Sequence, residues 1–276
     1  MYIAKLMKHR WEEEPISGIG KGFDGTFAIF FYGCTMRCIY CQNSKISHIS
    51  LSDIKESSWT SERLANEIIK AQDENVASVS FITGALYVDE IVDTIKLAKE
   101  KGLKIPVVYN SSGYETASQI RKLDGLIDIY LPDFKYFDNE LGKDLSNVPN
   151  YVDIAKECIK EMYRQNCIIK KNEYALIVRH LVLPGHTENS KKVLKYLYET
   201  YGDDIYISIM SQYTPIPGNK GIDSFPELKR KITKREYEKV VEYALELGIK
   251  NAFIQEGDVA KESFIPDFDI KDSSSP

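Results

Sequence analysis

Several features are scarce or absent in this chain of 276 residues. It has two tryptophans and four histidines, and no repeat of fixed period. No apolar run is long enough to cross a bilayer, and residues 1–10 lack the apolar core of a secretory signal. Acidic residues outnumber basic ones by 41 to 36, a net charge of -5 that disfavours a broad nucleic-acid footprint. We therefore expect a cytoplasmic protein with no membrane and no nucleic-acid partner.

Cysteine is also scarce, yet three of the five cysteines fall within eight residues. Cys34, Cys38 and Cys41 directly follow the apolar run 27–32. In a reducing compartment such a cluster more often binds metal than forms disulfides, and soft thiolates favour zinc, copper(I) or an iron–sulfur cluster. A tetrahedral zinc site would need a fourth ligand such as His48, and three buried core cysteines are the remaining structural alternative.

Strand patterns and helix patterns alternate along the chain. Runs rich in apolar, β-branched or aromatic residues predict strands at 27–32, 76–83, 105–109, 127–131, 175–183 and 205–210, with a short seventh at 251–255. Helical periodicity predicts helices at 60–71, 88–101, 115–123, 151–163 and 190–200, and after a capping box at Thr233 and Glu236. This alternation predicts an α/β fold of parallel strands joined by right-handed crossovers, either an open sheet or a barrel.

The spacing of the three cysteines resembles a known motif. Cys34-x3-Cys38-x2-Cys41, with Tyr40 before the last cysteine and a strand before the first, resembles the cluster motif of the radical SAM superfamily. The resemblance implies that the cysteines bind three irons of a [4Fe–4S] cluster and leave the fourth iron to S-adenosylmethionine (SAM). It also implies that Tyr40 lies near the adenine of SAM.

The same resemblance decides between sheet and barrel. It implies a partial (β/α)6 TIM-like barrel with chemistry at the carboxyl ends of the strands, as in parallel barrels generally. We expect a short amino-terminal extension at 1–15, the barrel at 16–255 and a carboxyl-terminal tail at 256–276 that packs on the barrel.

A closer resemblance is to the radical SAM group similar to pyruvate formate-lyase activating enzyme. The segments that carry it are 14–18, 41–43, 109–114, 128–136, 178–185 and 265–268. One departure is Thr83-Gly84-Ala85, where activating enzymes usually have a Gly-Gly-Glu type sequence that holds the SAM amino group. The resemblance implies SAM contacts from Tyr40, Thr83, Gly84, Asn110, Ser112, Asp133, Lys135, Arg179 and Gln212.

Two of these strand ends also carry charge patterns that invite a chemical interpretation. Asp133 and Lys135 stand two apart, so they point to one side of an extended chain; a surface ion pair is the plain alternative. Arg179 interrupts an apolar strand, and burying it without a partner would be costly. A ligand carboxylate or ribose would supply that partner. The neighbouring His180 is expected to be an ordinary hydrogen-bonded histidine.

The resemblance implies reductive cleavage of SAM to a 5′-deoxyadenosyl radical, which abstracts hydrogen from a substrate, with flavodoxin or ferredoxin as the electron donor. Three hypotheses for function remain. The protein activates a glycyl-radical enzyme, it acts directly on a small molecule or peptide, for example as an epimerase, or it is a non-catalytic metal-binding protein. For an epimerase, Cys167 is the candidate hydrogen donor, because Cys158 lies on the apolar face of a predicted helix.

Overall fold

The structure, a computed structural model, describes residues 1–170, 174–216 and 219–255, so the predicted tail at 256–276 lies outside the described residues. Within them, one five-stranded sheet has the order β1-β2-β3-β4-β5 and a three-stranded sheet has the order β6-β7-β8. Bridges from Tyr130 to Leu176 and from Asp133 to Arg179 join β5 to β6. The strands are β1 (Ile3–His9), β2 (Thr26–Phe31), β3 (Ser78–Ile82), β4 (Val107–Ser111), β5 (Ile129–Pro132), β6 (Ile177–Leu181), β7 (Tyr206–Met210) and β8 (Ala252–Ile254).

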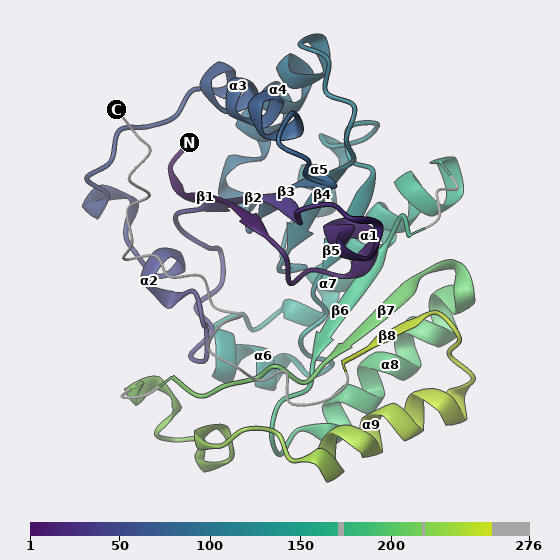
Figure 1. The fold of residues 1–276 in the computed structure, drawn as a ribbon. Coiled ribbons are helices and arrows are strands. Elements are labelled where there is room, and N and C mark those ends of the chain that lie inside the picture. Colours follow the sequence, from purple (N-terminus) through teal and green to yellow (C-terminus); the bar gives the residue numbers. More distant parts are fainter. Residues whose placement is uncertain (171–173, 217–218, 256–276) are drawn as a thin grey trace.

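The strands from β2 to β8 pair in parallel and curve into an open barrel, because no pairing among the described residues closes β1 onto β8. Figure 1 shows the curved sheet with helices on its outer side. This arrangement confirms the predicted partial barrel. The helices are α1 (Glu14–Ser17), α2 (Ser44–Ser47), α3 (Ser61–Gln72), α4 (Val88–Glu100), α5 (Ala117–Arg121), α6 (Asn139–Ser146), α7 (Tyr151–Tyr163), α8 (Thr187–Tyr201) and α9 (Lys234–Leu247).

Local sequence signals explain where several of these helices begin and end. The predicted capping box is present at α9, where the Thr233 side chain accepts from the backbone N–H of Glu236 and the Glu236 side chain accepts from that of Thr233. Gly248 ends α9 with a positive φ of 87°. Shorter helical turns lie at Ile19–Lys21, Leu51–Asp53, Ala85–Tyr87, Arg164–Lys170, Gly202–Asp204, Lys220–Ile222 and Pro226–Lys229.

The amino-terminal segment, predicted as a short extension, is attached to the sheet. Its strand β1 pairs antiparallel with β2 and covers the edge of the sheet. The predicted boundary at residue 15 falls inside α1, whose Ile16 is fully buried and packs in one cluster with the strand residues Val108, Ile129, Leu131 and Ile177. Ser78, at the start of β3, donates a hydrogen bond of 2.7 Å to the Ile16 carbonyl. The residues before β2 are therefore part of the barrel, and α1 fills its amino-terminal end.

The two faces of the strands differ in chemistry. Side chains alternate along a strand, so residues two apart share a face. The outer face is apolar and packs beneath the helices, as Val79 and Phe81 of β3 do. The residues of the inner face that pack with Ile16 are aliphatic, among them Val108 and Ile177. Closer to the carboxyl ends the inner face is polar, with Asn110, Arg179 and Ser208. The barrel therefore has an apolar floor and a polar interior above it.

The buried position of Ile16 makes a prediction about stability. We expect Ile16→Ala to lower the free energy of unfolding by about 2–5 kcal/mol, because it leaves a cavity in an apolar cluster to which β4, β5 and β6 contribute side chains. The exposed Ile19→Ala on the same segment should change it by less than about 0.5 kcal/mol. Urea unfolding followed by circular dichroism measures both, and equal effects would show that α1 does not fill the barrel.

Candidate cofactor site at the carboxyl ends of the strands

The three clustered cysteines lie on a loop that begins where β2 ends. Gly33 starts it with a positive φ of 86°, a conformation that glycine adopts without strain. Backbone N–H groups of Arg37 and Ile39 donate to the carbonyls of Ser146 and Leu145 at 3.0 and 2.9 Å. The loop is therefore fixed against the end of α6, a helix that the sequence analysis did not predict.

Each of the three sulfurs has a polar neighbour. Met36 N–H donates to Cys34 Sγ at 3.4 Å, and the hydroxyl of Ser146 donates to Cys38 Sγ at 3.0 Å. Cys41 Sγ lies 3.2 Å from the hydroxyl of Ser47. Burial raises the pKa of Cys38 to about 12 and also raises that of Cys34, while the positive charge of Lys135 opposes both shifts. A bound metal would favour deprotonation, because it compensates the thiolate charge.

The positions of the cysteines and of His48 indicate which kind of metal site the loop could form. No group of three histidine, cysteine or acidic side chains in the described part of the chain has the spacing of a single metal ion. His48, the fourth ligand of the zinc alternative, is exposed and lines an open pocket beside Arg37 and Asn219. The structure therefore gives the zinc alternative no support. A four-iron cluster would instead span the three cysteines with separate irons.

Tyr40 lies within the cysteine loop, between Cys38 and Cys41, in surroundings that the sequence did not predict. It is buried, and its hydroxyl is 2.5 Å from that of Tyr136, which in turn is 2.6 Å from the Ser146 hydroxyl. A hydrogen-bonded chain thus runs from Tyr40 to Cys38 through two side chains near α6. The ring of Tyr40 meets that of Tyr213 edge to face, at 6.1 Å between centroids. The contact of Tyr40 with adenine stays a prediction.

The ends of β3 and β4 carry two signs of a binding site. Thr83 has a positive φ of 59°, a strained conformation for a β-branched residue, and its N–H donates to the Asn110 carbonyl at 2.9 Å. The buried Ser112 hydroxyl has no hydrogen-bond partner among the described residues. At Gly113, a Cβ atom would lie 2.2 Å from the Asp133 carbonyl oxygen, so only glycine allows β4 and β5 to approach this closely.

A network of charges crosses the inside of the barrel at the level of Arg179. Arg179 Nε lies 3.2 Å from Asp133 Oδ1, and Lys135 Nζ lies 2.5 Å from Asp133 Oδ2. Arg179 Nη2 donates to Asn110 Oδ1 at 2.8 Å. Burial alone would raise the pKa of Asp133, but Lys135 and Arg179 together hold it below its usual value. Asp133 and Lys135 therefore form an ion pair that is mostly buried inside the barrel and does not lie at the surface, while their contact with SAM stays a prediction.

Glu12 completes this network and was not among the predicted site residues. Its side chain is 5% exposed, and its Oε2 pairs with Arg179 Nη1 at 3.1 Å while Asn110 Nδ2 donates to Oε1 at 3.2 Å. Arg179 thus has protein partners where a ligand carboxylate or ribose was predicted. Burial raises the pKa of Glu12, and Arg179 offsets part of that effect. The signal in the sequence was the acidic run Glu12-Glu13-Glu14 between a strand and a proline.

Gln212 and Cys167, two other predicted site residues, lie at opposite ends of the strands. Gln212 follows β7 near the cysteine loop, where its carbonyl accepts from Gln42 Nε2 at 3.3 Å. Cys167 instead lies near Asp204, whose carboxylate accepts from Tyr163 at 2.5 Å just before β7 begins. That is the amino-terminal edge of the sheet, whereas the cysteine loop follows a carboxyl end. The geometry therefore does not support Cys167 as a hydrogen donor.

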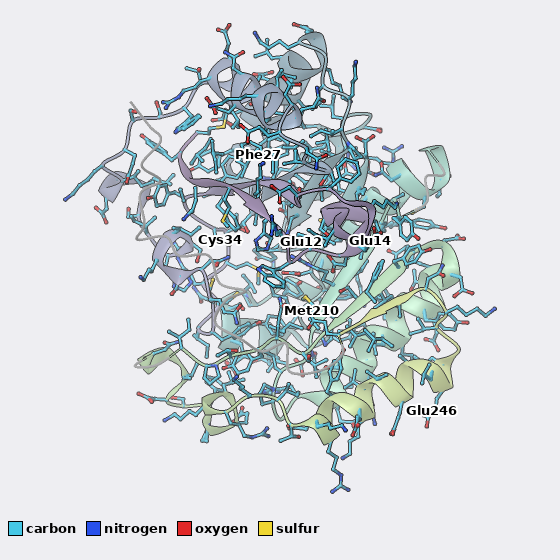
Figure 2. The ribbon with its side chains drawn as sticks, viewed as in Figure 1. Glu12, Glu14, Phe27, Cys34, Met210 and Glu246 are labelled. Carbon is cyan, nitrogen blue, oxygen red and sulfur yellow. The ribbon has the colours of Figure 1, made fainter. Side chains whose placement is uncertain are left out.

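The side chains on the inner face come from distant parts of the chain. Figure 2 shows Cys34, Glu12 and Met210 on the inner side of the curved sheet, whereas Glu246 of α9 points outward. His180, next to Arg179, points to the other face, where its ring nitrogens contact the Phe134 carbonyl at 2.7 Å and the Ser190 hydroxyl at 2.8 Å. Burial lowers the pKa of His180 to about 4, so it is a neutral structural histidine, as expected.

Comparison with known proteins identifies the fold and the loop together. A sequence profile of the radical SAM superfamily matches residues 28–197, which include the cysteine loop and the strands that carry the charge network. The chain belongs to the radical SAM superfamily. Superfamily members use a [4Fe–4S] cluster and SAM.

Two curated proteins are similar to this radical SAM chain. An uncharacterised protein of Methanocaldococcus jannaschii is 33% identical over 220 residues, which are 78% of this chain and 61% of that protein. A pyruvate formate-lyase-activating enzyme of Clostridium pasteurianum is 25% identical over 174 residues, 60% of this chain and 66% of that enzyme. The chain thus spans less than two thirds of the length of the first and about two thirds of the second.

Solved radical SAM structures share the fold at low sequence identity. Streptococcus suis SuiB bound to precursor peptide SuiA has a TM-score of 0.57 at 16% identity, over 88% of this chain and 51% of that one. Methylornithine synthase (PylB) has a TM-score of 0.56 at 14% identity, over 82% and 63%. These likenesses support the partial barrel and carry no information on the substrate.

The residues present fit the cofactors of the superfamily. Three thiols on one loop would hold the cluster, and the unpartnered Ser112 hydroxyl lies at a strand end beside the close approach at Gly113. The individual SAM contacts remain predictions.

Within the described residues, no helix is long and apolar enough to span a membrane.

The buried charge network predicts a pH-dependent loss of stability. We expect Arg179→Met to lower the free energy of unfolding by about 3–5 kcal/mol at pH 7, because Glu12 loses its paired cation and Asp133 keeps only Lys135. Burial already raises the folded-state pKa of Glu12, and without Arg179 this pKa rises further, so protonation of Glu12 stabilises the folded variant at low pH and this stabilisation is lost as the pH rises. The deficit should therefore narrow between pH 7 and pH 5. The exposed Lys122→Met should cost less than about 1 kcal/mol, and a similar loss for both would contradict the network.

The hydrogen bond from Ser146 to Cys38 predicts a shift in reduction potential. An O–H donor stabilises the more negative, reduced form of a cluster, so Ser146→Ala should lower the midpoint potential of the reconstituted protein. A redox titration followed by electron paramagnetic resonance measures it, with the exposed Ser52→Ala as control. An unchanged potential in Ser146→Ala would show that this hydroxyl does not act on the cluster.

Proposed function

We propose that this protein is a radical SAM enzyme that cleaves SAM reductively and abstracts hydrogen from an organic substrate. The observation that carries the proposal is the loop with Cys34, Cys38 and Cys41 at the carboxyl end of β2, in a chain that belongs to the superfamily. When bound, the cluster would pass one electron to the sulfonium of SAM, which gives methionine and a 5′-deoxyadenosyl radical.

The chain's own residues would bind and orient the cofactors. Cys34, Cys38 and Cys41 would hold the cluster at three positions. Asp133, Lys135 and Ser112 would face SAM from the ends of β4 and β5, where charged and hydroxyl groups can meet its amino acid part. Arg179 holds Asp133 and Asn110 in place from β6, because it contacts both. The barrel contributes orientation and exclusion of water, and we assign no acid–base step to these residues.

As to the substrate, we propose that the protein activates a glycyl-radical enzyme. The similarity to the activating enzyme of Clostridium pasteurianum supports this role. Thr83-Gly84-Ala85 departs from the Gly-Gly-Glu type sequence, so the SAM amino group would be held by Thr83 and backbone carbonyls instead of an acid. A flavodoxin or ferredoxin would be the electron donor.

Anaerobic reconstitution tests the proposal. Wild-type protein should bind about four iron and four sulfide per chain and, with dithionite, convert SAM to 5′-deoxyadenosine. Cys38→Ala should lose both properties, whereas Cys167→Ala, at the opposite edge of the sheet, should retain both. Zinc binding without SAM cleavage would contradict the proposal.

The activating role has its own measurement. After incubation with SAM, reductant and a glycyl-radical enzyme from the same organism, a glycyl radical signal should appear in the partner's electron paramagnetic resonance spectrum. SAM cleavage without such a signal would leave the radical chemistry intact and contradict the activating role.

A further inference from the structure

The amino-terminal strap, defined here as residues 10–17, brings acidic side chains into the barrel. It leaves the end of β1, and its Ile16 sits on the apolar floor beside Ile177. Glu12 and Glu13 precede Ile16 in the chain. They interact with Arg179 and Ser208, which lie opposite each other in the register of β6 and β7. Arg179 is the next inward-facing residue of β6 after Ile177, toward the carboxyl end of the strand. The strap therefore presents two adjacent carboxylates between the floor and the cysteine loop.

The two carboxylates differ in how well they are satisfied. Glu12 accepts from Arg179 and Asn110, so both of its oxygens have donors. Burial raises the pKa of Glu13, Arg179 and the nearby Ser208 side chain oppose that rise, and its Oε2 is buried without a hydrogen-bond partner among the described residues. A buried carboxylate oxygen without a donor is costly, and such a group in a folded protein calls for an explanation.

The charges around Glu13 do not balance. Glu12, Glu13 and Asp133 are three acids in this part of the barrel, and they face two cations, Arg179 and Lys135. His9 adds no charge near neutral pH, because burial and Arg179 lower its pKa to about 4. Arg179 is the cation acting on Glu13, but it is already paired with two other carboxylates. The surplus acid needs either a proton or an added cation.

The chemistry of the missing partner follows from this geometry. A hard metal ion would need several oxygen ligands, and no group of three candidate ligands with ion spacing exists among the described residues. A carboxylate or phosphate would be repelled by the surplus negative charge. An ammonium or guanidinium group would give Glu13 Oε2 its donor and supply the missing positive charge in one contact.

We propose that Glu13, next to Glu12, forms a subsite that binds a cationic nitrogen group of the substrate, an ammonium or a guanidinium. This rests on the proposed function, because the barrel interior below the cluster loop is then the place where a substrate binds. The subsite selects the substrate by charge and anchors one end of it on the strap. The cation belongs either to a small amine or to a lysine or arginine side chain in a polypeptide loop.

Ligand-observed NMR on the full-length, reconstituted, oxidised protein with SAM tests the subsite. The probes are 1-aminopentane and acetyl-Gly-Lys-Gly-amide, each compared with a neutral match, 1-pentanol and the norleucine peptide. At least one charged probe should bind more tightly than its match, and Glu13→Gln should weaken that binding by about tenfold or more. Glu14→Gln, an exposed acid on the same strap, should leave it unchanged.

The two sources of the cation are distinguished by which charged probe binds more tightly. Tighter binding of 1-aminopentane indicates a small amine, and tighter binding of the lysine peptide indicates a polypeptide loop. Glu13→Asp keeps the negative charge and should retain the preference for charged probes. If Glu13→Gln lowers the melting temperature, Glu13→Asp still tests whether the charge at this position selects the probe. Neutral probes that bind as well as charged ones, or an equal affinity in Glu13→Gln, would overturn the subsite.

SAM cleavage without any probe separates the subsite from the proposed function. Wild-type protein that cleaves SAM but shows no charge preference refutes the subsite alone. Wild-type protein that fails to cleave SAM, yet binds a charged probe through Glu13, refutes the proposed function and supports the subsite.

Discussion

Arg179 is a charged guanidinium held inside a barrel, and its need for partners organises the inner face. Its hydrogen bonds and ion pairs reach Asn110 on β4, Asp133 at the end of β5 and Glu12 on the amino-terminal strap. Because a buried cation without a partner is strongly destabilising, these three elements are constrained to one geometry. Lys135 then pairs with Asp133 and lies close enough to Cys38 to affect its pKa. The same network therefore connects the strap to the cysteine loop.

The outer layer supports this interior by ordinary apolar packing. Helices cover the apolar outer face of the strands, so the carboxyl ends of the strands are held in fixed positions (Figure 1). The cysteine loop depends on α6 in a more specific way. Two backbone hydrogen bonds attach the loop to the end of that helix, and Ser146 adds a donor to Cys38. Helix α6 thus helps to fix the loop and sets the surroundings of one sulfur, while Asn219 and Gln212 hold the loop from the other side of the barrel.

The accuracy of sequence-based prediction varied with the range of the interaction. The parallel strands and the covering helices were predictable, because each shows its periodicity within a short segment, as α9 does with its capping box. That Asp133 and Lys135 point to the same side was predictable, since they stand two apart on an extended chain, whereas their burial inside the barrel was not. The antiparallel pairing of β1 was missed, because the alternation in residues 3–9 is weak and its partner follows a segment that turns back through the barrel. Cys167 was chosen as a candidate hydrogen donor only because it is a thiol outside the cluster. The residues next to it in sequence do not indicate at which end of the strands it lies.

The sequence by itself indicated the chemistry of the candidate cofactor site, because three thiols within eight residues depend on local spacing and on the strand that precedes them. It also determined the fold class, through the repeated alternation of strand and helix. Only the tertiary structure decided which groups partner one another. The ion pair of Arg179 with Glu12, the buried oxygen of Glu13 and the Tyr40–Tyr136–Ser146–Cys38 chain join residues far apart in sequence. Such contacts leave no local pattern, since they arise when the barrel curves and desolvated polar groups must find partners across it.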